Sequence, residues 1–488
     1  MIERDSQLAT VSGLLERPGP ALIVVQGRPG MGLPSFLGHA LKGAHQLRFR
    51  FPDLADEDQR ALLEDSLDRV FGSTTGPIPE VRPVPSLRRS ASVSSGDRLT
   101  WEGILASVTV RATSPSPRTV LTLESMERAA PSSPRLSEAL ALGWNAIRRR
   151  STPLVLVLTG SDPEVMDQIA GPDSPLGSAV DARLTLDPLT IRGTSELLSR
   201  WRPRDRALAW ALLGGVPGRL ALLDTSRSLR RNMVSLLLDP SGPLHREMDG
   251  LVGGIRSLTH PARYGSLLRA VALGARTWSE IRRAFPGEGD AGRPGPYAER
   301  LRSLGLLGVE ISLDARVGSR KRRYRVTDPL LTWWYRFVVP RSPELAGGEA
   351  RRIWIEEVEP RLPQVLSASL AGAVRDLLIK RGAEVLGSEA RETGAIWNPE
   401  CEIPIAGTLR NGAVFYGLDP GATEPPGIEH LRHLEAQISE TRYGFGRERR
   451  LRIVTSLAEP DTPLKAAAAR QEGVRILGPR ELLGEALA

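Results

Sequence analysis

The stretch ALIVVQGRPGMGLPS, residues 21–35, decides the fold of the first part of the chain. Its apolar start predicts a buried β-strand, because a short continuous apolar run is typical of a strand covered on both faces. The glycine-rich turn that follows opens a predicted helix over residues 35–42. Strand, glycine loop and helix in this order are the first unit of an α/β nucleotide-binding fold.

The glycine loop has the spacing of a phosphate-binding Walker loop but lacks its reactive side chains. In the pattern G-x-x-x-x-G-K-[ST], the glycines let backbone N–H groups surround a phosphate, the Lys neutralises it and the hydroxyl holds Mg²⁺. Gly27, Gly30 and Gly32 are present, whereas Leu33 and Pro34 occupy the Lys and Ser/Thr positions. Pro34 also has no amide hydrogen to donate. The sequence therefore predicts a poor site for phosphoryl transfer.

Three side chains are candidates for the missing functions. Arg28 can act as a substitute cation, and Ser35 offers a hydroxyl one residue after the Walker position. The acidic strand of such folds normally ends in two carboxylates that hold Mg²⁺ and polarise water, but the strand TVLTLE at 119–124 ends in Glu124 followed by Ser125. Glu124 is thus the candidate catalytic residue, and a solvated strand end is the alternative.

Alternating strands and helices extend this unit. Strands are predicted at 47–51, 119–124, 154–160 and 182–186, and helices at 6–16, 55–70, 99–110 and 134–149. This alternation predicts a parallel sheet with helices on both faces. The segment 72–97, rich in Ser, Pro, Gly and Arg without periodicity, predicts a mobile loop, within which RRSAS at 88–92 is a weaker candidate for phosphorylation.

The rest of the chain divides into three further parts. After the α/β domain at 1–190 we expect a helical lid at 191–255, a winged helix at 256–340 and a small α/β domain at 341–488. The winged helix is predicted from three helices followed by two strands around the basic turn DARVGSRKRR. The aromatic run at 333–337 is interpreted as a buried helix joining it to the last part. A hairpin turned at Asn411-Gly412 is predicted in that last part.

Basic side chains on the predicted winged helix are candidates for binding nucleic acid. They are Arg300 and Arg302 on the recognition helix, and Arg316, Arg320, Lys321, Arg322 and Arg323 in the wing. Such residues contact phosphates and contribute affinity rather than sequence choice. The alternative is a protein-contact module with a solvated basic hairpin.

Composition sets the wider limits. The 488 residues exceed what one hydrophobic core supports, and the formal charge of +8 with a pI near 10.1 favours polyanionic partners. A single cysteine, Cys401, excludes an intramolecular disulfide. The longest apolar runs are strand-length, and no signal segment begins the chain, so we predict a cytoplasmic protein without membrane spans.

Several longer segments carry a family resemblance. They are Arg4-Asp5 with Leu8, Trp101-Glu102, LVLVLTGSDPEVM (154–166) with SPLGSAV (174–180), LLGGVPGRL (212–220), YGSLLRAVALGARTWSEI (264–281), PYAERLRSLGLL (296–307) and YRVTDPLLTWWYRFV (324–338). With these segments, nearly the whole chain resembles the archaeal-type ATPases of the STAND/AAA+ group, P-loop proteins that combine an ATPase module, a winged helix and a C-terminal restriction-nuclease-like domain.

The resemblance implies specific site residues. ATP and Mg²⁺ are the implied cofactors, with Ser161 at a sensor position and Pro217 near the adenine, beside the loop residues Gly27, Arg28, Gly30, Gly32 and Ser35. In the family's nuclease domain an Asp and a Glu-x-Lys hold a metal, but here Pro404 stands at the Asp position and no Lys lies between 380 and 465. Glu402 and Asp419 are the nearby carboxylates, and His430 with His433 lack a third ligand. We therefore expect no nuclease activity and no metal site.

Three functional hypotheses remain open. The leading one is a degenerate, non-catalytic scaffold that binds DNA or a protein assembly through the winged helix and the C-terminal domain. The second is an ATP-binding protein with weak ATPase activity that uses Arg28, Ser35 and Glu124. The third is a structural subunit of a larger complex.

Overall fold

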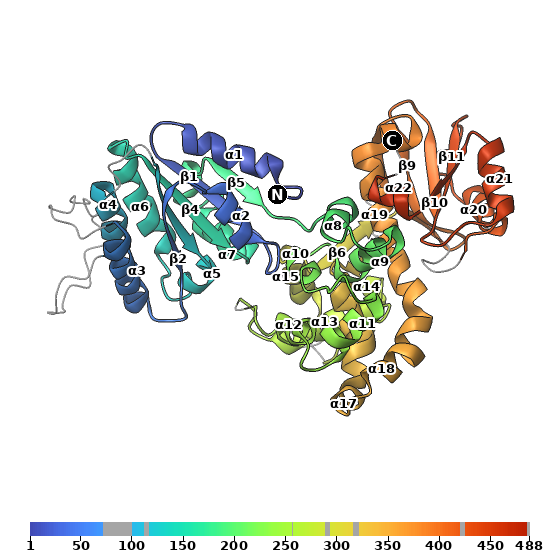
Figure 1. Ribbon diagram of the computed structural model, residues 1–488, viewed down its shortest axis with the longest axis horizontal. Coiled ribbons are helices and arrows are strands. Elements are labelled where there is room, and N and C mark those ends of the chain that lie inside the picture. The colour runs from blue at the N-terminus through green and yellow to red at the C-terminus, as the bar shows by residue number, and fades with distance from the viewer. Residues whose placement is uncertain are drawn as a thin grey trace. The chain divides into compact units, whose positions relative to one another are not determined.

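The computed structural model describes residues 1–71, 100–111, 117–255, 257–287, 293–315, 322–419 and 425–485. These residues form two compact units, Met1–Asp187 and Pro188–Ala488 (Figure 1). The loop predicted at 72–97, with its RRSAS segment, lies outside the described residues.

The first unit is built on a five-stranded parallel sheet, as the alternation of elements predicts. The strands are β1 (Ala21–Gln26), β2 (His45–Arg50), β3 (Thr119–Glu124), β4 (Leu154–Gly160) and β5 (Ala182–Thr185). Their order across the sheet is β2-β3-β4-β1-β5, and every neighbouring pair is parallel. The strand that begins the glycine loop, β1, is therefore separated from β3 by β4.

Helices cover this sheet, and several of them share an apolar core with it. They are α1 (Asp5–Glu16), α2 (Leu33–Ala40), α3 (Asp56–Phe71), α4 (Trp101–Arg111), α5 (Met126–Ala129), α6 (Leu136–Arg149) and α7 (Pro163–Ala170). Leu63 of α3, Ile104 of α4 and Trp144 of α6 are fully or almost fully buried in that core. Gly143 lets α4 and α6 approach closely, because a Cβ there would lie 2.7 Å from the Cβ of Leu105.

The second unit begins with short helices, as predicted for residues 191–255. They are α8 (Ile191–Leu197), α9 (Pro203–Leu213), α10 (Pro217–Leu220), α11 (Leu229–Met233) with the π-helical turn η3 (Val234–Leu238), and α12 (Pro243–Leu251). The break between α9 and α10 lies at Gly214 and Gly215, whose φ angles of +74° and +69° suit glycine. A Cβ at Gly215 would also collide with the carbonyl oxygen of Leu189.

Three helices and a hairpin follow in the order of a winged helix. They are α13 (Pro261–Ala272), α14 (Trp278–Ala284), α15 (Gly295–Ser303), β6 (Leu307–Ile311) and β7 (Arg322–Val326). The two strands pair antiparallel, with Leu307 opposite Val326. A capping box begins α14, in which Thr277 accepts from the amide of Glu280 and the Glu280 carboxylate accepts from the amide of Thr277.

A second sheet closes the chain. Its strands are β8 (Ala390–Trp397), β9 (Glu402–Leu409), β10 (Val414–Leu418), β11 (Arg450–Thr455) and β12 (Val474–Leu477), in the order β12-β11-β10-β9-β8. The β9–β10 hairpin matches the prediction, with Gly412 at φ +84° in its turn. Strands β10, β11 and β12 run parallel, and β8 pairs antiparallel with β9. Helices α20 (Ile428–Ser439), α21 (Thr462–Arg470) and α22 (Pro479–Leu483) complete this part.

Helices connect the hairpin to this second sheet. They include α16 (Pro329–Trp333), α17 (Ser342–Ala346), α18 (Ala350–Ile353) and α19 (Leu362–Leu386). The aromatic run is core, as predicted: Trp333, Trp334, Tyr335 and Phe337 are all buried. Among the described residues one helical stretch, Ala350–Leu386, is long and apolar enough to cross a membrane by length and composition, although the sequence analysis expected none. Its C-terminal part, α19, packs against β8, β9 and α9 within the unit.

Candidate functional site

The Walker-like loop keeps the backbone shape that its glycines allow. Gly30 and Gly32 have φ angles of +85° and +81°, a conformation that L side chains rarely adopt. Gly32 is the N-cap of α2, and its carbonyl accepts from the amide of Phe36 at 2.8 Å. The amide of Met31 donates to the carbonyl of Arg28 at 3.2 Å, and the Met31 side chain is buried beneath the turn. The loop therefore has this turn although the Walker Lys and Ser/Thr are absent from its sequence.

The side chains at the start of α2 offer little to a phosphate. Leu33 and Pro34 form the first turn of the helix, so the turn has an apolar side chain where a Lys would stand and lacks one amide donor. Pro34 and Ser35 are exposed, and Arg28 is half-buried at the beginning of the loop. Arg28 and Ser35 are therefore the remaining groups in the loop for charge and hydroxyl chemistry.

Glu124, the candidate catalytic residue, is held by two arginines of the neighbouring strand. The Nε of Arg48 lies 2.6 Å from Oε1 of Glu124, and an Nη of Arg50 lies 3.3 Å from Oε2. The Glu124 side chain is only 7% exposed, while those of Arg48 and Arg50 are 29% and 61% exposed. Both carboxylate oxygens thus accept charge-assisted hydrogen bonds from protein cations.

The pairing of β2 with β3 explains this arrangement. Leu47 and Phe49 are buried in the core, so the alternation of a strand places Arg48 and Arg50 together on the opposite face. In the register, Arg50 lies directly opposite Glu124, and Arg48 lies two residues earlier on the same face. Directly opposed and diagonal side chains on one face of a sheet are within reach of each other.

A second carboxylate lies after β3 and is also engaged. Ser161 follows β4, at the predicted sensor position, and its hydroxyl donates to Oε1 of Glu127 at 3.0 Å while its amide donates to Oε2 at 3.2 Å. Glu127 belongs to α5, whose N-cap Ser125 has a left-handed φ of +63°. Gly160 lies close to this contact, because a Cβ there would lie 2.9 Å from Glu127 Oε2 and 2.5 Å from the Met166 sulfur, and these side chains would have to shift.

These contacts limit which reactions the residues at the carboxyl ends of β3 and β4 can support. A Mg²⁺ site for phosphoryl transfer needs carboxylate or hydroxyl oxygens directed at the metal and a cation on the phosphate. Here Glu124 is neutralised by two guanidinium groups and Glu127 holds Ser161. The arrangement stabilises the carboxyl end of the sheet through ion pairs within the chain.

The other family-implied residue, Pro217, lies in the second unit, where it begins α10. Two residues later, Arg219 is almost fully buried and binds Asp328 through two parallel hydrogen bonds of 2.8 Å. Its Nε also donates to Glu247 at 2.8 Å. Burial alone would lower the pKa of Arg219, but the carboxylates of Asp328 and Glu247 outweigh it and leave that pKa raised.

The basic residues predicted to bind nucleic acid differ in whether they contact other side chains. Arg300 on α15 donates to the hydroxyls of Ser303 and Ser257, and Arg302 pairs with Glu299 at 2.7 Å. Arg322 is exposed at the start of β7. Arg316, Arg320 and Lys321 lie outside the described residues.

Arg323 links the winged-helix hairpin to the C-terminal sheet. Its guanidinium lies 2.9 Å from Glu402 and 4.8 Å from the centre of the Trp397 ring, a cation–π contact. Arg276 also pairs with Glu402, at 3.0 Å. Glu402, a carboxylate near the predicted position of a nuclease-type site, is thus bound by Arg276 and Arg323.

The remaining candidates in the C-terminal part have structural contacts. Pro404 lies within β9, and Nδ1 of His430 accepts from the amide of Gly427 at 2.9 Å. Cys401 is a buried free thiol. Across the parts of the chain that the structure describes, no group of three or more His, Cys, Asp or Glu side chains is arranged to hold a metal ion.

Sequence reasoning missed Arg48, Arg50 and Glu127. The sequence does contain a signal for the arginines, since LRFRF alternates apolar and basic side chains, as a strand with one buried face would. It contains no information that β2, rather than another strand, lies beside β3. Glu127 is three residues past the strand and becomes visible only through its contact with Ser161.

Comparison with known proteins finds several solved structures that are similar to this chain at low sequence identity. A Walker-type ATPase of Pyrococcus abyssi is 16% identical with a TM-score of 0.49, over 69% of this chain and 96% of that one. The ORC2 protein of Aeropyrum pernix is 14% identical with a TM-score of 0.43, over 73% and 96%. A STAND protein of Pyrococcus horikoshii is 11% identical with a TM-score of 0.29, over 79% and 50%. No family model and no curated protein matches the sequence.

Proposed function

We propose that this chain is a P-loop-type protein that does not hydrolyse ATP and acts as a scaffold. The observation that carries the proposal is the double ion pair of Glu124 with Arg48 and Arg50. In a hydrolysing site this carboxylate must be directed at water or at the Mg²⁺ shell, and here both of its oxygens are bound by guanidinium groups.

The loop supports the same proposal independently. Phosphate transfer needs a cation on the transferred group and a ligand for Mg²⁺, and Leu33 and Pro34 supply neither. Gly30 and Gly32 give the loop its turn, so the loop can form without the side chains that phosphoryl transfer needs. ATP and Mg²⁺ remain proposed ligands only if Arg28 and Ser35 take over those roles.

Hydrolysis is tested with the purified chain and Mg²⁺–ATP. We expect no turnover above a heat-treated control, and the same absence in Glu124→Gln. Turnover that is saturable and disappears in Glu124→Gln would contradict the proposal and establish the weak-ATPase alternative. A matched control is Glu138→Gln, which removes a carboxylate of an exposed ion pair on α6.

We further propose that the winged helix and the C-terminal sheet form the scaffold's binding part, in the cytoplasm, with DNA or a protein assembly as partner. Arg322 is exposed at the wing, and Arg302 is exposed on α15 beside Glu299. Guanidinium groups on these elements suit phosphate contacts.

The two partners are separated by measuring the binding of a labelled DNA duplex at two salt concentrations. Loss of affinity in Arg302→Ala with Arg322→Ala, together with weaker binding at higher salt, supports DNA. Equal binding by wild type and variant would exclude DNA contact through these residues. The protein-assembly hypothesis, including a structural subunit of a larger complex, would then be the one to pursue.

A further inference from the structure

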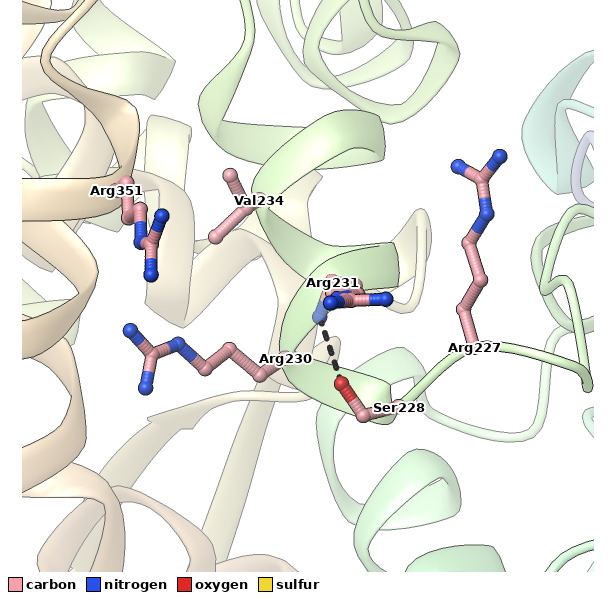
Figure 2. Close-up of a pocket in the computed structure, with 6 residues that line it drawn as sticks. All are labelled: Arg227, Ser228, Arg230, Arg231, Val234 and Arg351. Carbon is pink, nitrogen blue, oxygen red and sulfur yellow. Dashed lines mark hydrogen bonds between the residues drawn. The ribbon is translucent and has the colours of Figure 1, made fainter.

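A pocket in the second unit is lined by four arginines. Its lining residues are Arg227, Ser228, Arg230, Arg231, Val234 and Arg351, and its volume is about 670 Å³. The pocket lies between α11 with its continuation η3 and the neighbouring helix α18, which pack against each other. Figure 2 shows Arg230 extending from α11 toward the helix that carries Arg351. A cavity of a few hundred Å³ is in the size range of small-molecule sites.

The positive charges of the pocket are only partly balanced by carboxylates of the protein. Arg227 pairs with Asp224 at 3.0 Å, and Arg230 lies 3.7 Å from Glu359, which is long for an ion pair. For Arg231 and Arg351 the structure describes no carboxylate partner within the residues that it covers. Two of the four guanidinium groups that line the pocket thus lack a carboxylate partner among the described residues, and a bound anion would supply the counter-charge.

The local fold fixes the arginines that face the pocket. Ser228 is the N-cap of α11, and its hydroxyl accepts from the amide of Arg231 at 3.3 Å (Figure 2). Asn232 anchors the loop before the helix, because its side chain bonds the amide and the carbonyl of Asp224 at 2.8 and 2.9 Å. The backbone that carries Arg227, Arg230 and Arg231 is therefore held in place before any ligand arrives.

We propose that this pocket binds a small ligand that carries a chain of phosphates. Arginine matches phosphate oxygens with two parallel hydrogen bonds, and several arginines around one cavity suit several phosphates in sequence. The limited volume favours a small molecule over a macromolecule. The site is separate from the Walker-like loop and does not depend on whether that loop binds nucleotide.

Inorganic tripolyphosphate, without Mg²⁺, is the probe for a calorimetric titration of the whole chain at low salt. We expect one binding site per chain. The double variant Arg231→Ala, Arg351→Ala should bind about a hundredfold more weakly, since each arginine loses at least one charge-assisted hydrogen bond and each such bond contributes about tenfold. The double variant to Lys keeps the charge but loses the paired geometry, so it should fall between the two.

The matched control is Arg148→Ala with Arg149→Ala, two exposed arginines at the end of α6. Unchanged binding in this control supports a specific site, whereas an equal loss in both double variants means general charge attraction and overturns the proposal. Thermal melting of all variants checks that they are folded.

Three further results would overturn the proposal. One is the absence of tripolyphosphate binding by wild type. Another is binding that is lost in Arg28→Ala and kept in the pocket variant, which would assign the phosphates to the loop. The last is a DNA duplex that binds through Arg231 and Arg351 while tripolyphosphate does not, which would make the pocket part of a nucleic-acid surface.

Discussion

The Nε of Arg48 lies 2.6 Å from Oε1 of Glu124, at the point where two parallel strands of the first unit end. Arg50, on the same face of β2, binds the other carboxylate oxygen. The two ion pairs of Glu124 with Arg48 and Arg50 are called the clamp below. A buried carboxylate that is the expected centre of a hydrolytic site is thus used to join two strands. The substitution Glu124→Gln separates the two roles. A structural role predicts a loss of stability, whereas a catalytic role predicts a loss of ATP hydrolysis.

Glu124→Gln should destabilise the first unit. The change leaves two guanidinium groups without a counter-charge, and we expect a loss of about 2 kcal/mol in the free energy of unfolding, discounted for the exposure of Arg50. Urea denaturation of wild type and variant measures it. Glu138→Gln, in an exposed pair, should change less than about 0.5 kcal/mol, and equal losses in both variants would contradict the clamp.

Arg219→Met should destabilise the second unit more strongly. Both Arg219 and Asp328 have side chains only 4% exposed, so the substitution leaves a buried carboxylate without its partner, at a loss of about 3–5 kcal/mol. Arg219→Lys should recover only part of the loss, because Lys cannot form the two parallel hydrogen bonds.

Chemical denaturation of both Arg219 variants, followed by the fluorescence of the buried Trp333 and Trp334, checks this expectation. Asp328 also caps α16 by accepting from the amide of Leu330, so Asp328→Ala should lose at least as much stability. Losses below about 1 kcal/mol in both single variants would mean that the pair contributes no more than a surface one.

Arg118 holds the end of α1 to the sheet. Its guanidinium donates to the carbonyls of Leu14 and Leu15 at 3.0 and 3.2 Å, and also to those of Arg17 and Gly19. These carbonyls belong to the last turn of α1 and to the turn after it. A cation at the C-terminal end of a helix also interacts favourably with the helix dipole.

Arg118→Met should therefore cost about 2 kcal/mol of stability in the first unit, because several carbonyls lose their donor together. Hydrogen exchange should show faster opening of α1, with the core strands β3 and β4 unaffected. The exposed Arg149→Met on α6 is the control, and the same change in exchange for both variants would contradict a specific role.

Cys401 should react slowly with thiol reagents in the folded protein. Burial raises the pKa of its thiol, with Asp314 and Glu400 adding to the effect. Since the thiolate is the reactive form, the pH at which reaction becomes fast should lie above that of the unfolded chain. Stopped assays with a disulfide reagent from pH 7 to 10 measure it, and equal rates in folded and denatured protein would contradict the burial.

Repair of the loop should restore binding but not turnover. Leu33→Lys with Pro34→Thr returns the cation, the hydroxyl and the amide to a turn that Gly30 and Gly32 already shape. We expect calorimetry to detect Mg²⁺–ATP binding in this variant. Hydrolysis should still be absent while Arg48 and Arg50 hold Glu124, and strong hydrolysis by the repaired loop alone would contradict the clamp.

Local sequence patterns were sufficient for most elements of the fold. The predicted strands at 119–124 and 154–160 coincide with β3 and β4, because continuous apolar runs between turn residues leave few alternatives. The strands β8 and β12 were not predicted. The first six residues of β8 are exposed or half-buried and only its last two are buried, and β12 is only four residues long, so neither has the long apolar run that marks a buried strand.

The sequence shows which side chains the loop lacks, but not which residues contact Glu124 and Ser161. The missing Lys and hydroxyl of the loop follow directly from Leu33 and Pro34. The state of Glu124 depends on which strand lies beside β3 and in which register, and both are properties of the folded sheet. The same holds for Arg323, which local sequence places in a basic wing and tertiary structure places on Trp397 and Glu402.

Steady-state ATP hydrolysis by the wild-type chain with Mg²⁺, beside a calorimetric titration of the same preparation, is the measurement that decides whether the first unit is an enzyme. We predict no hydrolysis, and no saturable heat of binding once the arginine pocket is removed by Arg231→Ala with Arg351→Ala, because the loop lacks its cation and Glu124 is bound by Arg48 and Arg50. Saturable hydrolysis that Glu124→Gln abolishes would contradict the account and show that the carboxylate leaves its arginines to act on water.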